Sequence, residues 1–449
     1  GSAKMTGLIP FMGRQMANIG YAFKGGKAPA KLMKKVTFDA YEKQLKDGSF
    51  ISSIKEETDR YLADEYCAFT CSYGFYKYFF KMFVEIYKNF DLIDTYHFIG
   101  YGVMFPSSAC DNKMCKALVN EIRNAKKSID IAAYELYDIP DLMNSIKSAK
   151  KRGVKVRYVT DNSTLTKTFN KVKLEELADI VKDDGISKQS HRLMHNKFFI
   201  FDDKKVWTGS ANLTPTSFSG FNANTSLLIT SDEIAKIYKK EFENYMNGKF
   251  HNDKETVYGN FNNARIKVYF SPQNYTITKE IIKEIKNAKS YIHIPAFIIT
   301  HKKFTDALIE AHNRGVEVKV ITDANSSKNK YSTHNLLRNK KIPVKTENFA
   351  GTMHMKNIII DGETVITGSM NFTKSGEQYN DENSLIIKDK EIAENFENTF
   401  QTIWAKIPNK YLYRDPHAES FESAGSCFDG IDNNYNGLID SLEPYCKQK

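Results

Sequence analysis

A 21-residue motif occurs twice in this chain, and no other feature restricts the possible folds as strongly. The first copy, MHNKFFIFDDKKVWTGSANLT, spans 194–214, and the second, MHMKNIIIDGETVITGSMNFT, spans 353–373. The repeat extends beyond the motif: EIRNAKKSIDIAAYELYD (121–138) matches EIKNAKSYIHIPAFIITH (284–301), and KRGVKVRYVTD (151–161) matches NRGVEVKVITD (313–323). The chain therefore contains two units of one design.

Each unit reads as helix, buried strand, helix and strand, followed by a hairpin. In the first unit, apolar residues at helical spacing (Ala117, Leu118, Ile122 and Ala125) precede the apolar strand SIDIAAY. NKFFIF and KNIII are predicted strands, DDKK and DGET are turns, and VWT and VIT are return strands. The pair Asp361-Gly362 is a strong two-residue hairpin signal. Strands that alternate with helices predict an α/β fold with a mainly parallel sheet.

Four parts are expected along the chain. Residues 1–100 are predicted to be a mostly helical, aromatic-rich extension, 101–250 and 251–410 the two α/β halves, and 411–449 a linker with a tail bracketed by cysteines. The aromatic stretch 73–90 is interrupted by lysines, so it is not predicted to span a membrane. It suits either core packing or an amphipathic surface helix.

The catalytic candidates follow from the two-residue period of a strand. His195 faces the same side as Lys197, and His354 the same side as Lys356. Past each Gly-Ser bend, at Ser210 and Ser369, an asparagine is expected to return an amide to this face; the two are Asn212 and Asn371. The aspartates seven residues after each histidine face elsewhere and are expected to pin the hairpins; they are Asp202 and Asp361.

Two imidazoles, two ammonium groups and two amides suit phosphodiester chemistry. Lysines and asparagines can hold the non-bridging oxygens and stabilise charge in the transition state without a metal. One imidazole can attack phosphorus, and the other can protonate the leaving oxygen and then deprotonate water. A lone strand histidine is more often packed or merely exposed, but two in matching surroundings argue against that alternative. No cofactor is expected for catalysis.

These paired motifs resemble the HKD motifs of the phospholipase D superfamily, over residues 103–402. The resemblance implies two pseudo-symmetric α/β/α halves packed as an intramolecular dimer, with one active site at the seam and a covalent phosphohistidine intermediate. It also implies that an acidic residue after each motif orients the histidine of the opposite half. Glu382 stands at that position in the second half and Asn224 in the first. His195 is therefore expected to be the nucleophile and His354 the general acid and base.

The substrate class is open between nucleic acid and membrane phospholipid. The net charge of +10, from 64 basic and 54 acidic residues, favours an anionic partner, and nucleic acid is the preferred expectation. Lys188, Arg192 and Trp207 are candidates for lining a groove for single strands. Phospholipid hydrolysis is the alternative, and a non-catalytic phosphate binder is a third possibility. Both motifs lie in one chain, so a monomer is expected to suffice, with no obligate protein partner.

Six cysteines occur in three close pairs: Cys67 and Cys71, Cys110 and Cys115, and Cys427 and Cys446. Local pairs suit disulfides and a secreted or periplasmic location. The connectivity of the first four is open, and free thiols in a cytosolic protein are the alternative for them.

The tail contains DNNYNGLIDSLE, which fits the calcium-loop pattern D-x-[DN]-x-[DN]-G-x5-E. The tail resembles short calcium-binding appendages of secreted bacterial proteins. The predicted ligands of a structural Ca²⁺ are Asp432, Asn434, Asn436, Leu438 (through its carbonyl), Asp440 and Glu443. An asparagine-rich turn without an ion is the alternative.

Overall fold

The structure, a computed structural model, describes residues 92–165, 171–185, 192–260 and 265–447. Contacts divide the chain into Gly1–Asp91 and Leu92–Lys449, and every described residue belongs to the second unit. The predicted helical extension, including Cys67 and Cys71, therefore lies outside the described residues as far as Asp91. Its last residues are not helical, because Leu92–Phe98 forms a strand paired with the first sheet.

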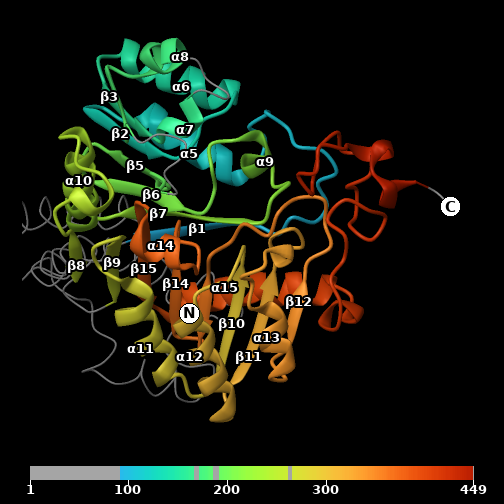
Figure 1. Ribbon diagram of the computed structural model, residues 1–449. Coiled ribbons are helices and arrows are strands. Elements are labelled where there is room, and N and C mark those ends of the chain that lie inside the picture. Colours follow the sequence, from blue (N-terminus) through green and yellow to red (C-terminus); the bar gives the residue numbers. More distant parts are fainter. Residues whose placement is uncertain (1–91, 166–170, 186–191, 261–264, 448–449) are drawn as a thin grey trace, which may run out of the picture. The chain divides into compact units, whose positions relative to one another are not determined.

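The first repeat forms a seven-stranded sheet in the order β1-β7-β6-β5-β2-β3-β4 (Figure 1). Its strands are β1 (Leu92–Phe98), β2 (Ser128–Ala133), β3 (Lys155–Thr160), β4 (Ile180–Asp183), β5 (Lys197–Phe201), β6 (Lys205–Gly209) and β7 (Asn224–Thr230). Its helices are α5 (Lys113–Asn124), α6 (Pro140–Lys151), α7 (Asn162–Leu165), α8 (Lys171–Leu177), α9 (Pro215–Phe218) and α10 (Asp232–Met246). Strands β2, β3 and β4 run parallel, whereas the motif hairpin and β1 add antiparallel strands. The sheet is therefore mixed and not mainly parallel.

The second repeat forms an eight-stranded sheet in the order β12-β11-β10-β13-β14-β15-β9-β8. Its strands are β8 (Tyr258–Asn260), β9 (Ile266–Ser271), β10 (Tyr291–Ala296), β11 (Glu317–Thr322), β12 (Val344–Thr346), β13 (Ile358–Ile360), β14 (Thr364–Gly368) and β15 (Glu382–Lys388). Its α-helices are α11 (Ile282–Asn287), α12 (Lys302–Asn313), α13 (His334–Asn339), α14 (Lys374–Gln378) and α15 (Lys390–Lys406), with a π-helical turn at Ile277–Ile281. Apart from β8, the strand order repeats that of the first sheet, which confirms the two α/β halves.

The described residues form three apolar cores, one within each half and one shared between the halves. Helices α5 and α6 pack one core against the first sheet, and α11 and α12 pack the corresponding core in the second half. The third core is shared, because Phe198 and Leu227 from one sheet cluster with Ile359 and Leu385 from the other. Residues of α10 and α15 complete this shared core. The two sheets therefore fold as one body, with the motifs at their junction.

The motif hairpins turn where the sequence predicts. The backbone is left-handed at Asp202 (φ 53°) and Asp203 (φ 56°), and again at Asp361 (φ 55°) and Gly362 (φ 66°), as a tight hairpin between twisted strands requires. The Asp202 carboxylate accepts the N–H groups of residues 126–128, and the Asp361 carboxylate those of residues 289–291. Each aspartate thereby fastens its hairpin to the loop entering the neighbouring strand.

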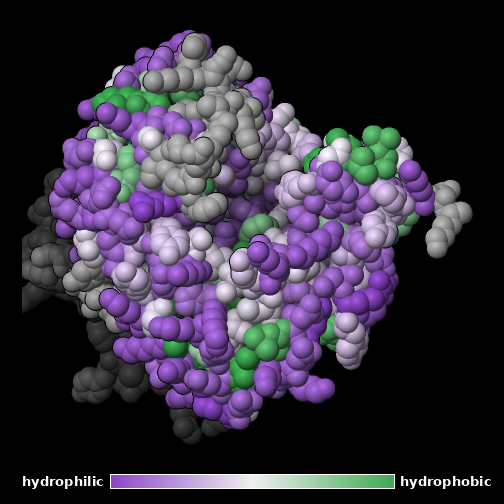
Figure 2. All heavy atoms as spheres, in the orientation of Figure 1, coloured by the Kyte–Doolittle hydropathy of each residue, from purple (hydrophilic) through white to green (hydrophobic). Residues whose placement is uncertain are grey.

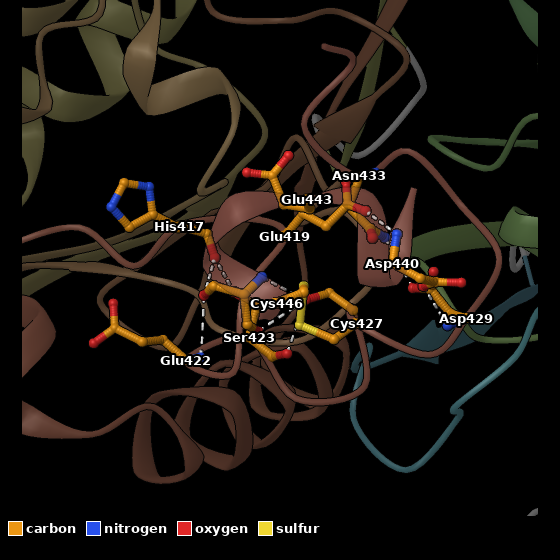
Figure 3. Close-up of a disulfide and its surroundings, with 12 residues drawn as sticks. His417, Glu419, Glu422, Ser423, Cys427, Asp429, Asn433, Asp440, Glu443 and Cys446 are labelled. Atoms are coloured by element: carbon orange, nitrogen blue, oxygen red, sulfur yellow. Dashed lines mark hydrogen bonds between the residues drawn. A yellow bond between two sulfur atoms is a disulfide. The ribbon is translucent and has the colours of Figure 1, made fainter. Parts of the chain in front are cut away.

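The tail is closed by a disulfide between Cys427 and Cys446 (Figure 3), and a second disulfide joins Cys110 to Cys115. The tail packs on residues 348–350, which lead into the second motif. Ala350 N donates to Ala424 O at 3.1 Å, and Asn433 Nδ2 donates to Ala350 O at 2.8 Å. None of the helices in the described ranges has the length and apolarity needed to cross a bilayer.

Candidate active site

The two motifs meet across the seam between the halves, at symmetric positions. His195 N donates to Asp381 O at 3.0 Å, and His354 N donates to Ala223 O at 2.9 Å. Each motif is therefore tied by its backbone to the residue immediately before β15 or β7 in the opposite half. Figure 2 shows a hollow at the junction of the halves on the face that it presents.

His195 is held by a carboxylate from the other half. Its Nδ1 lies 2.9 Å from both oxygens of Glu382, which is fully buried at the start of β15. Ser369 Oγ donates to the same carboxylate at 2.6 Å. The carboxylate fixes the ring and accepts its Nδ1 proton, leaving Nε2 with a free lone pair. The contact that the family resemblance implied is present.

His354 has an amide in the corresponding place. Its Nδ1 lies 3.1 Å from Asn224 Oδ1, and Ser210 Oγ donates to that oxygen at 2.9 Å. For Ser210 to reach Asn224, the backbone of Gly209 must lie close to that of Thr225. Glycine allows this approach, because a Cβ on Gly209 would lie 2.2 Å from Thr225 O. The amide orients the second imidazole but does not stabilise its positive charge as a carboxylate does. The two histidines therefore differ in electrostatic support.

The lysines complete the site in both halves. Lys197 and Lys356 are each 2% exposed, and each Nζ donates to the carbonyl of its own motif histidine at 2.6 Å. An aromatic ring packs edge-on to each histidine: Tyr134 at 5.0 Å from His195 and Phe297 at 5.3 Å from His354, between ring centroids. The ammonium groups are thus buried beside the imidazoles, and their hydrogen bonds to backbone carbonyls fix their orientation.

Burial sets the protonation of these groups. Burial, followed by Lys197 and Lys356, holds the pKa of His195 well below its usual value. Burial and the same two lysines also depress the pKa of His354. The pKa of Lys197 falls to about 8 by burial, and burial raises the pKa of Glu382 to about 7. The same two lysines lower the pKa of both histidines, as expected for groups of one site.

The asparagines differ between the halves. Asn212 Nδ2 donates to the Glu135 carboxylate at 2.6 Å. Within the described part of the chain, the buried Oδ1 atoms of Asn212 and Asn371 have no hydrogen-bond partner. Glu135 was not predicted to belong to the site. The signal for it was the repeat itself, since Glu135 stands where the second half has Ile298.

Two further aspartates support the motifs. Asp161 accepts from Met194 N at 2.9 Å, and Asp323 accepts from Met353 N at 3.2 Å. Each aspartate ends a repeated strand segment and holds the residue immediately before a histidine. Their matching positions in YVTD and VITD were the available signal.

A buried ion network lies beneath the first motif. Lys254 Nζ contacts Asp381 Oδ1 at 2.8 Å and also pairs with Glu241, and all three side chains are fully buried. Tyr245 Oη donates to Glu241 at 2.5 Å and accepts from Asn196 Nδ2 at 2.8 Å. At the position of Asp381 the first half has Ala223. The network therefore stabilises the His195 side of the seam selectively.

The calcium site predicted for the tail is not supported. No three His, Cys, Asp or Glu side chains converge on a possible metal position in the ranges that the structure describes. Asp440 accepts the N–H groups of Asp429 and Gly430, while Glu443 accepts from Asn436 Nδ2 at 2.7 Å. Figure 3 shows the carboxylate of Asp440 beside Asp429, with that of Glu443 pointing elsewhere.

The remaining predicted ligands of this loop also serve its own backbone. Asp432 accepts from Asn436 N and Gly437 N, Asn434 from Asn436 N, and Asn436 Oδ1 from Leu438 N. The loop is thus closed by internal hydrogen bonds, and its carboxylates are not gathered around one point.

The predicted groove for single strands is wrong in one of its residues. Trp207 is 2% exposed and packs against Tyr96, because its side of the sheet is covered by the core that helices α5 and α6 form with the first sheet. Arg192 is exposed, and Lys188 lies outside the described residues.

Known proteins resemble this chain in sequence and in fold. A family model described as "Cardiolipin synthase, PLD-like domain" matches residues 118–246 and 281–404, more than half of the chain. A phospholipase D of Rickettsia bellii is 37% identical over 133 residues, covering 30% of this chain and 66% of that protein. The mitochondrial cardiolipin hydrolase of Homo sapiens is 32% identical over 157 residues, covering 35% of this chain and 61% of that protein. The matches thus span slightly less than two thirds of these relatives.

Among solved structures, the phosphatidylserine synthase of Haemophilus influenzae aligns with a TM-score of 0.54 at 13% identity, over 72% of this chain and 89% of that one. This likeness concerns the fold. A phospholipase D family member of Salmonella typhimurium, Nuc, is 33% identical over 34% of this chain and 97% of its own, with a TM-score of 0.31. Two matched segments, one in each half, and the paired histidine-lysine motifs show that the chain belongs to the PLD-like family, the phospholipase D superfamily.

Proposed function

We propose that this protein hydrolyses phosphodiesters through a covalent phosphohistidine on His195, without a metal. The observation that carries the proposal is the Glu382 carboxylate on Nδ1 of His195, opposite an amide on His354. A carboxylate on Nδ1 stabilises the positive charge that the ring acquires when Nε2 attacks. The four positively charged or polar groups from Lys197, Lys356, Asn212 and Asn371 are suited to holding the phosphate oxygens.

In the first step, His195 Nε2 forms a bond to phosphorus as the bond to the leaving oxygen breaks. His354, protonated when the anionic diester is bound, gives its proton to the leaving oxygen, so an alcohol departs. In the second step, neutral His354 takes a proton from water as the water oxygen attacks phosphorus. The P–N bond breaks, and its electron pair returns to His195. The enzyme is regenerated and a phosphomonoester is released.

Phospholipid is the substrate class that the surface favours, in contrast to the sequence-based preference for nucleic acid. The tail exposes several large apolar residues on one small unit: Phe421, Phe428, Tyr435, Leu438, Ile439, Leu442 and Tyr445. Figure 2 shows apolar surface on the tail, at the right. Such side chains enter a lipid interface readily. Relatives named phospholipase D and cardiolipin hydrolase also favour a phospholipid substrate.

Nuclease activity is the second candidate, since the chain carries a net charge of +10. Product release should be measured from mixed phosphatidylcholine and phosphatidylglycerol vesicles and from single-stranded DNA, in excess EDTA. The intact protein is expected to release products from vesicles, and His195→Ala to release none. Cleavage of DNA alone would replace phospholipid by nucleic acid, and loss of all activity with EDTA would contradict metal independence.

The depressed pKa values of the two motif lysines predict the alkaline limb of the pH profile. Burial lowers the pKa of Lys197 to about 8 and holds that of Lys356 well below its usual value. Each ammonium group holds the phosphate only while protonated, so the loss of kcat/KM with rising pH is expected to be complete above about pH 8. On the acidic side, the depressed pKa of His195 keeps the nucleophile neutral below the range of an ordinary histidine. The measurement is kcat/KM against pH for a soluble diester.

Lys197→Arg and Lys356→Arg are the control variants for this limb, because a guanidinium does not lose its proton in this range. The limb is expected to disappear from the residual activity of the variant that replaces the titrating lysine. A limb that persists in both variants would show that neither lysine controls it.

We also infer that the protein works in an oxidising compartment outside the cytoplasm. Two disulfides, Cys110–Cys115 and Cys427–Cys446, support this inference, because such bonds are rare where thiols are kept reduced.

A further inference from the structure

Most of the large apolar side chains that are exposed among the described residues lie in two short segments. One segment is the loop between β1 and α5, where Met104 and Phe105 are each more than half exposed. The other is the disulfide-closed tail, where the same holds for Phe421, Phe428 and Leu442. Figure 1 shows the loop beside the tail, at the right. These five side chains are called the apolar rim below.

The loop and the tail are held together by a residue near the second motif. Tyr101 Oη donates to Asn348 Oδ1 at 2.7 Å, and Asn348 Nδ2 donates to Glu422 O at 3.1 Å. A Cβ on Gly425 would lie 4.0 Å from Met104 O, so the two segments adjoin. Both halves of the apolar rim are therefore fixed to the segment that leads into the second motif.

The tail supplies acceptors for its own backbone N–H groups. Three carboxylates do so: Asp432 accepts from residues 436 and 437, Glu419 from residues 433 and 440, and Asp440 from residues 429 and 430. Backbone donors without acceptors are costly in a medium of low dielectric constant. The tail can therefore approach such a medium while these donors stay hydrogen-bonded.

We propose that the apolar rim docks on a phospholipid bilayer and inserts its side chains among the lipids just below the headgroups. Aromatic and long aliphatic side chains enter this region readily, because their apolar parts leave water while polar neighbours stay hydrated. Docking holds the candidate active site at the membrane surface. The inference rests on the proposed phospholipid substrate and adds how the enzyme reaches it.

Charge selects the kind of bilayer. Residues 411–447 contain seven acidic and two basic side chains, whereas the whole chain has a net charge of +10. An anionic lipid surface would repel the tail, and a zwitterionic surface would not. The three carboxylates that bind the backbone of the tail are also not arranged to pair with a basic protein. These observations favour a zwitterionic bilayer as the partner.

Binding should be measured by sedimentation with phosphatidylcholine vesicles, with His195→Ala as the background so that no lipid is consumed. The protein is expected to bind, and to stay bound at high salt, where attraction between charges is screened. Phe428→Ser and Leu442→Ser should each weaken the partition into vesicles about tenfold or more. The matched control is Tyr275→Ser, which removes an exposed ring from the turn after β9 and should leave binding unchanged.

Insertion is tested with Phe428→Trp on the same background. Its emission is expected to shift to shorter wavelengths with phosphatidylcholine vesicles and to be quenched by brominated acyl chains, whereas Tyr275→Trp should show neither effect. Binding without quenching, or binding that high salt abolishes, would show contact with the charged surface only and would overturn the proposal. Absence of vesicle binding would also overturn it and would leave the apolar rim to a protein partner.

Turnover separates docking from catalysis. With His195 in place, Phe428→Ser should lower the rate on phosphatidylcholine vesicles about tenfold and leave the rate on soluble bis(p-nitrophenyl) phosphate unchanged. An equal loss on both substrates would overturn docking as the role of this side chain. If neither substrate is turned over while the vesicles are bound as expected, the proposed function fails and docking stands.

Discussion

His354→Asn is expected to stop turnover and to trap the covalent intermediate on His195. With bis(p-nitrophenyl) phosphate, nitrophenolate leaves without needing a proton, so the first step survives the substitution. Hydrolysis of the P–N bond then lacks its general base, whose removal typically costs about 10²–10⁴ in rate. The expected result is a burst of one nitrophenolate per active site, followed by a slow steady state. Alkaline peptide mapping should find the nitrophenylphosphoryl adduct on the peptide containing His195.

His195→Asn is the matched control, because it keeps the general acid and removes the nucleophile. It is expected to show neither burst nor adduct, and turnover reduced at least as far. An adduct on His354 in this variant would reverse the assignment of roles. Both proteins should melt within a few degrees of the intact chain, so that loss of activity is not loss of fold.

Lys254→Met is expected to be the most destabilising single change considered for this protein. Lys254 Nζ contacts Asp381 and Glu241 and donates to Ser271 O at 2.7 Å, with no side-chain exposure. Its removal leaves two buried carboxylates without the ammonium group between them, and Asp381 then keeps only the contact with His251 Nδ1 at 3.1 Å among its ion-pair contacts in the described residues. Breaking a buried ion pair in this way typically costs about 3–5 kcal/mol. The free energy of unfolding should be measured by urea denaturation at neutral pH.

Lys249→Met supplies the comparison for this variant, because Lys249 pairs with Glu255 at the surface, where their side chains are 43% and 76% exposed. Its effect is expected to stay within about 0.5 kcal/mol. Equal stability of the two variants would show that Lys254 is not needed to neutralise the buried carboxylates. If Lys254→Met loses activity at temperatures where it remains folded, the loss would show that the network also supports the position of His195 at the seam.

The repeat made much of the fold predictable. A strand period of two places His195 with Lys197, and the turn residues Asp361 and Gly362 define the hairpin; both features are local and depend only on neighbouring residues. The relation between the halves was accessible through family resemblance, which implied that Glu382 orients His195. The structure supplies that contact across 187 residues of sequence.

The features that were missed or wrong depend on tertiary packing. Trp207 was predicted from its residue type to line a groove, but its ring points to the side of the sheet that α5 and α6 cover, so it is part of the core. Glu135 carries no motif, and its place beside Asn212 follows only once β2 lies next to β5. The calcium pattern specified ligand types at fixed spacing, but not whether Asp440 would instead cap the chain at Asp429. The pairing of Cys110 with Cys115 likewise needed coordinates.

Because each histidine is held by the opposite half, the two copies of the motif are not interchangeable modules. A symmetric pair of second halves would give both copies of His354 a Glu382, and a symmetric pair of first halves would give both copies of His195 only Asn224. Exchanging Asn224 and Glu382 should therefore move the carboxylate to His354 and transfer the nucleophile's role to the second copy. Under the proposed mechanism, one histidine attacks phosphorus while its counterpart moves protons, a division of labour that the sequences of two identical subunits could not specify.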